Sequence, residues 1–281
     1  MSVVAVVTDS TCYLPPGVAD RHGITVVPLQ VVLGGRPLLE GRDVFPTDLA
    51  AALGSHVAVS TSRPTTAEFA RIFQAVVDAG APGIVSVHLS GDLSGSVDAA
   101  RLAAADVAVP IAVVDSRSTA MGLGFAVLAA AEATAEGADV AEAAARARLA
   151  AAATSVLFCV DTLEYLRRGG RIGAAAALLG AALSIKPILS IRDGRIDVAE
   201  KVRTTVRAAR RLGDLAVALA DGPVDAAVHH LAAPDRAAAL SGRLRAEVPE
   251  LVDLYVSEVG PTVAAHTGPG MVGVVICRRD R

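Results

Sequence analysis

The 281-residue sequence contains no tryptophan, and aromatic residues make up only 3% of it. Proteins that bind single-stranded nucleic acids commonly stack bases on aromatic rings, and the formal charge of −3 provides no excess of basic residues for a phosphate backbone. We therefore expect no nucleic-acid partner. Apolar residues nevertheless make up 53% of the chain, so alanine, valine and leucine must fill the core.

Cysteine is also scarce, and the three cysteines are far apart. Cys12, Cys159 and Cys277 show no CxxC spacing, which favours reduced thiols in a cytoplasm over a disulfide framework or a zinc site. No apolar run is long and helical enough to span a bilayer. The chain begins directly with a predicted strand, without a basic segment or a cleavage site. We expect a cytoplasmic protein without a metal.

The first 120 residues do contain one recurring pattern, a short β-branched run that ends in a cluster of hydroxyls. Such runs predict parallel strands buried on both faces. In open parallel sheets, ligands bind beyond the carboxyl ends of the strands. The pattern therefore predicts a ligand site made of neutral hydrogen-bond donors. The runs are 3–7, 57–59, 84–87 and 111–114, and the hydroxyls that follow them include Thr8, Ser10, Ser60, Thr61, Ser62, Ser90, Ser94, Ser116, Ser118 and Thr119.

Strands and helices alternate in the first half of the sequence, whereas the second half contains a predicted hairpin. The alternation predicts a parallel, Rossmann-like sheet with helices on both faces. Two short runs around Asp193-Gly194 predict a β-hairpin, and hence a mixed sheet covered by helices. We therefore expect an α/β protein with two domains, 1–152 and 153–281. Helices are expected near 46–54, 65–79, 95–106, 120–136, 139–152, 173–183, 203–220 and 234–247, and the later strands near 155–161, 225–231, 251–257 and 272–277.

Six short motifs occur in order along the chain. They are Thr8-Asp9-Ser10-Thr11, Thr61-Ser62-Arg63-Pro64, Leu93-Ser94-Gly95, Val114-Asp115-Ser116, the segment 163–172 that ends in Gly169-Gly170-Arg171-Ile172, and His266-Thr267-Gly268-Pro269-Gly270. Each motif alone is weakly specific, but their order and spacing make a strong match over essentially the whole chain. On these motifs the sequence resembles the DegV family.

The resemblance implies a carrier rather than an enzyme. A protein of this kind encloses one long-chain fatty acid in a tunnel at the junction of its two domains, and it needs no other cofactor. It presents the carboxylate to a separate ATP-dependent fatty acid kinase subunit, which makes the acyl phosphate for phospholipid synthesis. Because the lipid must be released at a surface, the resemblance also implies transient contact with a membrane.

The resemblance assigns the fatty acid carboxylate to Thr61, Ser94 and His266. Hydroxyls can donate to a carboxylate, and burying that group without partners is costly. Ordinary structural roles remain open for the same residues. Thr61 and Ser94 are suitable helix caps, and His266 precedes a glycine-proline turn.

Further residues of these motifs are expected near the carboxylate end. Asp9 can instead close an Asx turn or cap a helix, and the backbone N–H groups around Gly268 can form an anion-binding nest. The family often has glutamine at the position of Arg63, so a cation here can either pair with the carboxylate or point outward. The full set is Asp9, Ser10, Ser62, Arg63, Thr267 and Gly268.

Two arginines match positions that the family uses for contact with the kinase, namely Arg171 and Arg203. Together with Arg167, Arg168 and Lys201 they form a like-charged group that would complement an acidic partner or nucleotide phosphates. A solvated face of unrelated salt bridges is the simpler alternative.

An acyl chain of about sixteen carbons carries roughly 12 kcal/mol of transfer free energy, at ~0.8 kcal/mol per methylene. The carrier must therefore enclose it. The alanine- and leucine-rich segment 174–183 could line such a tunnel, or it could simply pack a helix.

Other classes of function remain as alternatives. Asp9, Ser94 and His266 could form a hydrolase triad, although the sequence has no Gly-x-Ser-x-Gly elbow. A kinase would need a Walker A loop or a glycine-rich fingerprint, and neither occurs. The adjacent His229 and His230 would point to opposite faces of a strand, which does not suit a metal site. A small-metabolite sensor remains open.

Overall fold

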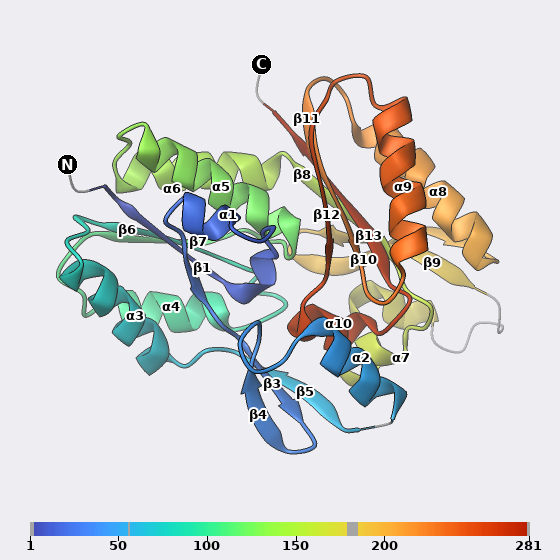
Figure 1. Ribbon diagram of the computed structural model, residues 1–281, viewed down its shortest axis with the longest axis horizontal. Helices are drawn as coiled ribbons and strands as arrows, with labels where there is room; N and C mark the ends of the chain where they lie inside the picture. Colours follow the sequence, from blue (N-terminus) through green and yellow to red (C-terminus); the bar gives the residue numbers. More distant parts are fainter. Residues whose placement is uncertain (1–2, 56, 179–184, 280–281) are drawn as a thin grey trace.

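The computed structural model describes residues 3–55, 57–178 and 185–279, and the first part of the chain is built on a four-stranded parallel sheet (Figure 1). The strand order is β2-β1-β6-β7. The bounds are Ala5–Asp9 (β1), Thr25–Val27 (β2), Ile84–His88 (β6) and Ile111–Asp115 (β7). Three of the four predicted runs are thus confirmed as parallel strands.

Successive side chains of these strands face opposite helical layers. Val7 packs with Phe69 on one face, whereas Val6 packs with Leu123 on the other. Because both faces are covered, most positions are apolar, and the buried polar residues Asp9, Ser86 and His88 are hydrogen-bonded to one another. The covering helices are α3 (Thr66–Asp78) and α4 (Ser96–Ala104) on the first face and α5 (Met121–Ala135) and α6 (Val140–Ala152) on the second.

The second part of the chain is a six-stranded mixed sheet in the order β10-β9-β8-β13-β11-β12, as the hairpin pattern predicted. Only β11 and β12 pair in parallel. The strands are β8 (Thr154–Cys159), β9 (Lys186–Arg192), β10 (Arg195–Val202), β11 (Val224–His230), β12 (Leu251–Glu258) and β13 (Val272–Arg278). One face is covered by α8 (Thr205–Leu219) and α9 (Pro234–Glu247).

The two sheets share one hydrophobic core. Helices α5 and α6 lie between them (Figure 1), and Val156 and Val275 of the mixed sheet pack in the same cluster as Val6 of the parallel sheet. The predicted domain boundary falls in the short connection between Ala152 and Thr154. Because one hydrophobic core is continuous across this boundary, the two halves of the chain pack directly against each other.

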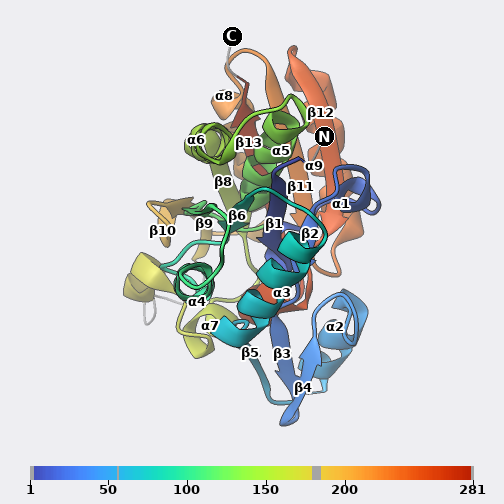
Figure 2. The same cartoon turned by 90° about the vertical axis from the view of Figure 1, so that its left-hand side faces the viewer.

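A third, three-stranded sheet corrects one prediction. The run 57–59 was expected to form a parallel strand, but β5 (Val59–Ser62) is the edge of an antiparallel sheet with β3 (Gln30–Leu33) and β4 (Arg36–Leu39). Its side chains are at most half-buried, so three apolar residues were too few to specify a strand buried on both faces. In both cartoon views this sheet and α2 (Pro46–Gly54) project from one end of the molecule (Figure 2).

The remaining elements are short. They are α1 (Val18–Arg21), α7 (Glu164–Arg168), α10 (Pro261–Thr267) and two 3₁₀ helices, Ser10–Cys12 and Gly173–Leu178. The predicted helix 173–183 is therefore a 3₁₀ helix up to Leu178, and its remainder lies outside the described residues. Within the described ranges, no helix combines the length and the apolar character that crossing a membrane would require.

Candidate functional site

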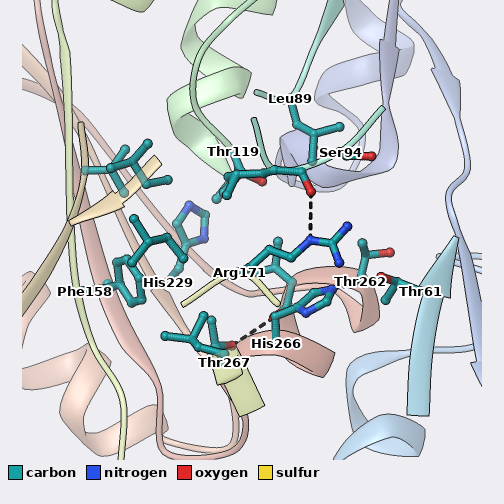
Figure 3. A pocket seen from close by; sticks show the side chains of 18 of the residues that line it. Thr61, Leu89, Ser94, Thr119, Phe158, Arg171, His229, Thr262, His266 and Thr267 are labelled. Carbon is teal, nitrogen blue, oxygen red and sulfur yellow. Dashed lines mark hydrogen bonds between the residues drawn. The ribbon is translucent and has the colours of Figure 1, made fainter. Parts of the chain in front are cut away.

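An apolar pocket lies where β5, α10 and the loops after β6 and β7 meet the face of the mixed sheet (Figure 3). It holds about 1040 Å³ of space free of protein atoms, including open space at its mouth. Its walls come from both halves of the chain. Apolar lining residues are Leu29, Leu89, Leu93, Val156, Phe158, Leu166, Ile191, Ile196, Val263, Met271, Val274 and Val275.

The polar end of the pocket joins residues 205 positions apart. Thr61 on β5 and His266 on α10 are hydrogen-bonded, with 2.9 Å between Oγ1 and Nε2. His266 Nδ1 is buried without a hydrogen-bond partner among the described residues, and it lies against Gly169, where a β-carbon would come within 1.9 Å. A proton on Nδ1 would be an unsatisfied buried donor, so we assign the proton to Nε2, which donates to Thr61. The Thr61 hydroxyl is then free to donate to a ligand.

His266 itself is neutral near pH 7. Burial, and secondly the charge of Arg171, lower the pKa of His266 from 6.5 to about 4. It therefore orients Thr61 without adding a positive charge to the site.

Arg171 supplies a positive charge at this end of the pocket. Its Nε donates to the Leu93 carbonyl at 3.0 Å and its Nη1 to the Gly169 carbonyl at 2.6 Å. These bonds hold the guanidinium between Ser94 and His266 (Figure 3). The residue that was predicted to contact the kinase thus lines the ligand pocket.

Ser94 lies in a turn that is tied to the β9–β10 hairpin. The Ser94 amide donates to the Ser90 carbonyl at 3.0 Å, and the Ser90 hydroxyl donates to the Gly194 carbonyl at 2.7 Å. The N-cap residue of α4 is Gly95. The hydroxyl oxygens of Ser94 and Ser96 lie 3.0 Å apart and are hydrogen-bonded. Ser94 is therefore not the helix cap, and it lines the pocket.

Thr61 is not a helix cap either, because α3 is capped by the Thr65 side chain. Arg63, two residues after Thr61, lies at the exposed rim of the pocket. Its Nη1 donates to the Gly95 carbonyl at 3.0 Å. The charge of Arg63 is thus held at the mouth and shared with solvent.

A second cavity adjoins the first on the other side of its polar end. Both are lined by Thr61, Arg171 and His266, which therefore form the partition between them. The second cavity, here called the outer recess, is more polar. Its other lining residues are Leu53, Val57, Ala58, Val59, Ser60, Tyr165, Arg168, Gly169 and Ala265.

Asp9 is fully buried and is not among the residues that line the pocket. Its Oδ2 accepts hydrogen bonds from the Leu89 amide and from His88 Nδ1, both at 3.0 Å. Its Oδ1 accepts from the Thr11 amide, so Asp9 caps the short helix Ser10–Cys12. This is the structural alternative that the sequence left open.

The hydrolase triad considered from the sequence is not assembled. Asp9, Ser94 and His266 each have a different partner, namely His88, Ser96 and Thr61. No hydrogen bond joins the three to one another among those found in the described part of the chain.

The other predicted site residues divide into two groups. Ser62 and Thr267 line the pocket, whereas Ser10 and Gly268 are not among its lining residues. Gly268 packs against the Tyr165 ring, where a β-carbon would come within 2.2 Å. Arg203 is exposed between β10 and α8, away from the lining set.

His229 and Thr262 also line the pocket, although the sequence considered His229 only as a metal ligand and did not consider Thr262. His229 Nε2 accepts from the Met121 amide and its Nδ1 donates to the Ser257 hydroxyl, both at 3.1 Å. Burial lowers the pKa of His229 to about 4, so it is neutral. Successive side chains of a strand point to opposite faces, and this alternation turns His229 toward the pocket. The alternation was the one signal in the sequence that could have placed His229 in the site.

No cluster of three or more histidine, cysteine, aspartate or glutamate side chains suited to a metal ion occurs within the described ranges. The donors at the polar end are hydroxyls, one imidazole and a guanidinium. They suit an anionic oxygen ligand rather than a cation.

Comparison with known proteins gives consistent matches over the full length. The model of the DegV family matches residues 3–279. A DegV domain-containing protein of Streptomyces coelicolor is 56% identical over 277 residues, which cover 98% of this chain and 99% of that protein.

Two solved structures are similar in fold and sequence. One is described as showing fatty acid binding of a DegV family protein from Thermus thermophilus, with 34% identity, a TM-score of 0.93 and coverage of 99% of this chain and 100% of that chain. The other is DegV, a fatty acid binding protein from Bacillus subtilis, with 30% identity, a TM-score of 0.91 and coverage of 99% and 100%.

Proposed function

The chain belongs to the DegV family, and from this premise we propose that it binds one long-chain fatty acid in the pocket between its two sheets. The two similar structures from Thermus thermophilus and Bacillus subtilis are described as binding fatty acids, which supports the proposal. The observation that carries it is an apolar pocket that ends in a cluster of anion-binding groups, Thr61, Ser94, Arg171 and His266.

The carboxylate is held at this polar end. Thr61 donates one hydrogen bond because its lone pair already accepts from His266. Ser94 donates a second, and the nearby guanidinium of Arg171 offsets the negative charge. The acyl chain lies along Phe158 and the neighbouring apolar wall, where each buried methylene contributes about 0.8 kcal/mol.

The site supports binding rather than hydrolysis. A serine or threonine nucleophile requires a base, and the base requires a third group that orients it. Here His266 Nδ1 packs against Gly169 instead of an acid. Within the described part of the chain, the imidazole therefore has no hydrogen-bonded carboxylate to stabilise its protonated form.

We further propose that the carrier presents the carboxylate to a separate ATP-dependent kinase subunit. The outer recess supports this role, because it reaches Thr61, His266 and Arg171 from the side opposite the acyl pocket. Arg168 and Arg171 there suit phosphate oxygens. The acyl phosphate would then serve phospholipid synthesis.

The same proposal places the carrier in the cytoplasm with transient contact to a membrane. The reason is physical, because an acyl chain that leaves the pocket must enter another apolar phase.

Native mass spectrometry of protein purified from cells tests the binding proposal. We expect one molecule of a long-chain fatty acid per chain, released on denaturation and identified in the extract. Protein that is consistently empty, and that takes up no palmitate from solution, would refute the proposal.

The kinase proposal is tested with the purified partner and two arginine variants. Arg203→Ala should lower acyl-phosphate formation about tenfold while palmitate affinity stays unchanged, since the residue is exposed and outside the pocket. Arg171→Ala should lower both, because Arg171 lines the pocket and the recess. Arg245→Ala, an exposed arginine on α9, is the matched control. Equal losses for all three variants would contradict a defined partner surface.

A further inference from the structure

A buried carboxylate, Glu40, lies behind the polar end of the pocket. Only 5% of its surface is exposed. Its Oε1 accepts hydrogen bonds from the Thr262 amide at 2.7 Å and the Tyr13 hydroxyl at 3.1 Å. Its Oε2 accepts from the Thr262 hydroxyl at 2.8 Å and from the Ser10 hydroxyl. Four donors thus converge on one carboxylate.

These contacts suit an ionised Glu40. The Ser10 oxygen already accepts from the Leu29 amide, and the Tyr13 oxygen accepts from the Val263 amide. Each hydroxyl therefore has its own hydrogen available as a donor, to Glu40 or, for Tyr13, to the Gly260 carbonyl. Burial raises the pKa of Glu40, and the hydrogen bonds from Ser10, Thr262 and Tyr13 oppose that rise in part. The Thr262 amide can only donate, so Glu40 Oε1 serves as its acceptor in either protonation state.

The network is anchored to the first turn of α10. Gly260 precedes this helix and offers no side chain to cap it, so Glu40 supplies the acceptor for the Thr262 amide. The fit is close, because a β-carbon on Gly260 would come within 2.5 Å of both Glu40 Oε1 and the Tyr13 ring. The Tyr13 hydroxyl also lies 3.2 Å from the Gly260 carbonyl.

Helix α10 carries a large part of the polar end. Thr262, Val263, His266 and Thr267 all line the pocket. Thr262 and His266 are four residues apart, so they lie on the same face of the helix, one turn from each other. Fixing Thr262 therefore fixes the distance and orientation of His266 toward Thr61 on β5.

We propose that Glu40 is a positioning residue for fatty acid binding, which anchors α10 so that His266 meets Thr61 at the carboxylate end of the pocket. Ser10 and Tyr13 complete this anchor, here called the Glu40 clamp. Glu40 is not among the pocket-lining residues and acts through α10. The inference rests on the proposed function for the ligand and on the hydrogen bonds above for the geometry. It also gives a role to Ser10, which the sequence had placed near the carboxylate.

The test is Glu40→Gln, which keeps the size of the side chain but turns one acceptor into a donor. We expect the dissociation constant for palmitate to rise about tenfold, since one of the two acceptor oxygens that hold α10 is replaced by a donor. NMR titration of the ring should show His266 titrating closer to 6.5 than to about 4, because the helix that buries it shifts. Ser86→Ala is the matched control. It removes a hydrogen bond from an equally buried network and should change neither readout.

Loss of stability in Glu40→Gln with unchanged palmitate affinity and unchanged His266 titration would overturn the proposal. If that variant does not fold, Tyr13→Phe removes one arm of the clamp, and we expect about a threefold weaker affinity. Unchanged affinity there would equally overturn it. Wild-type protein that takes up no palmitate would refute the proposed function, whereas the His266 titration of the empty protein would still test the clamp.

Discussion

Two histidines of this protein lie in hydrogen-bonded networks of very different accessibility. His88 joins Ser86, at 2.7 Å from Nε2, to Asp9, at 3.0 Å from Nδ1, and all three side chains are fully buried. Among the described residues His266 joins Thr61 alone, yet it borders both the acyl pocket and the outer recess.

The comparison shows that access, rather than the order of hydrogen bonds, decides which network can meet a ligand. Ser86, His88 and Asp9 reproduce the bonding pattern of a catalytic triad. Since a substrate cannot reach them, the network acts on the fold. The bond from the Leu89 amide to Asp9, next to the pocket wall, does not involve Ser86 or His88. The simpler pair, Thr61 and His266, lines the pocket and can therefore contact a ligand.

The largest expected effect comes from His88→Ala. Removing one partner of a buried pair leaves Asp9 under-satisfied, and we expect the free energy of unfolding to fall by about 3 kcal/mol or more. Palmitate affinity of the folded fraction should stay within about twofold. Denaturant unfolding and ligand titration measure the two quantities. Labelling of Ser86 in the wild type by a fluorophosphonate would show that the network is accessible after all.

Thr61→Val should produce the opposite result. The substitution removes a hydrogen bond to a carboxylate, worth about 1.5–3 kcal/mol, so affinity should fall at least tenfold with little change in stability. Thr66→Val, on the exposed first turn of α3, serves as control. If both variants bound palmitate equally well, Thr61 would not hold the ligand.

The pH dependence of stability sharpens the comparison. His266 and His229 each have a folded pKa of about 4, below the ordinary 6.5. Between these values the unfolded chain binds more protons than the folded one. Stability that is present above pH 6.5 should therefore be lost as the pH falls toward 4, by about 1–2 kcal/mol per histidine at pH 5.

Unfolding measured at several pH values in wild type and His266→Gln checks this expectation. The variant should lose part of the pH dependence, since only His229 of the two remains. A slope that is identical in both proteins would show that His266 is not the group responsible.

The smallest effect is expected from Arg63→Gln. Arg63 is exposed and donates to the Gly95 carbonyl, so its charge is screened by solvent. Palmitate affinity should change by less than about threefold, which a competition assay can resolve. A tenfold loss would show that Arg63 turns inward to pair with the carboxylate.

Several features of the fold followed from local pattern alone. The runs 3–7, 84–87 and 111–114 are apolar except for Ser86, and they form strands covered by helices on both faces. The run 57–59 did not follow the same rule. Its pairing with β3 depends on a distant partner, so its three residues could not specify the sheet.

The candidate site was less accessible to sequence reasoning. Thr61, Ser94 and His266 were found through motifs, whereas Arg171 was expected on a partner surface and lies in the pocket. Glu40 carried no motif, because its role arises from donors 27 to 222 positions away in the chain. Long-range packing of this kind leaves no periodic signal.

The sequence by itself determined the elements, because strand and helix periodicity is a local property of the chain. It also determined the chemistry available to a ligand, which is hydroxyls and arginines with few aromatics. Only the tertiary structure decided which of these groups share a cavity. Thr61 and His266, and likewise Glu40 and Thr262, meet because a core cluster that includes Val31 of β3, Leu49 of α2 and Ala264 of α10 brings distant segments together. The burial of each polar side chain then decides whether it is neutral, whether solvent and ligands are excluded from it, and whether it can contact a ligand.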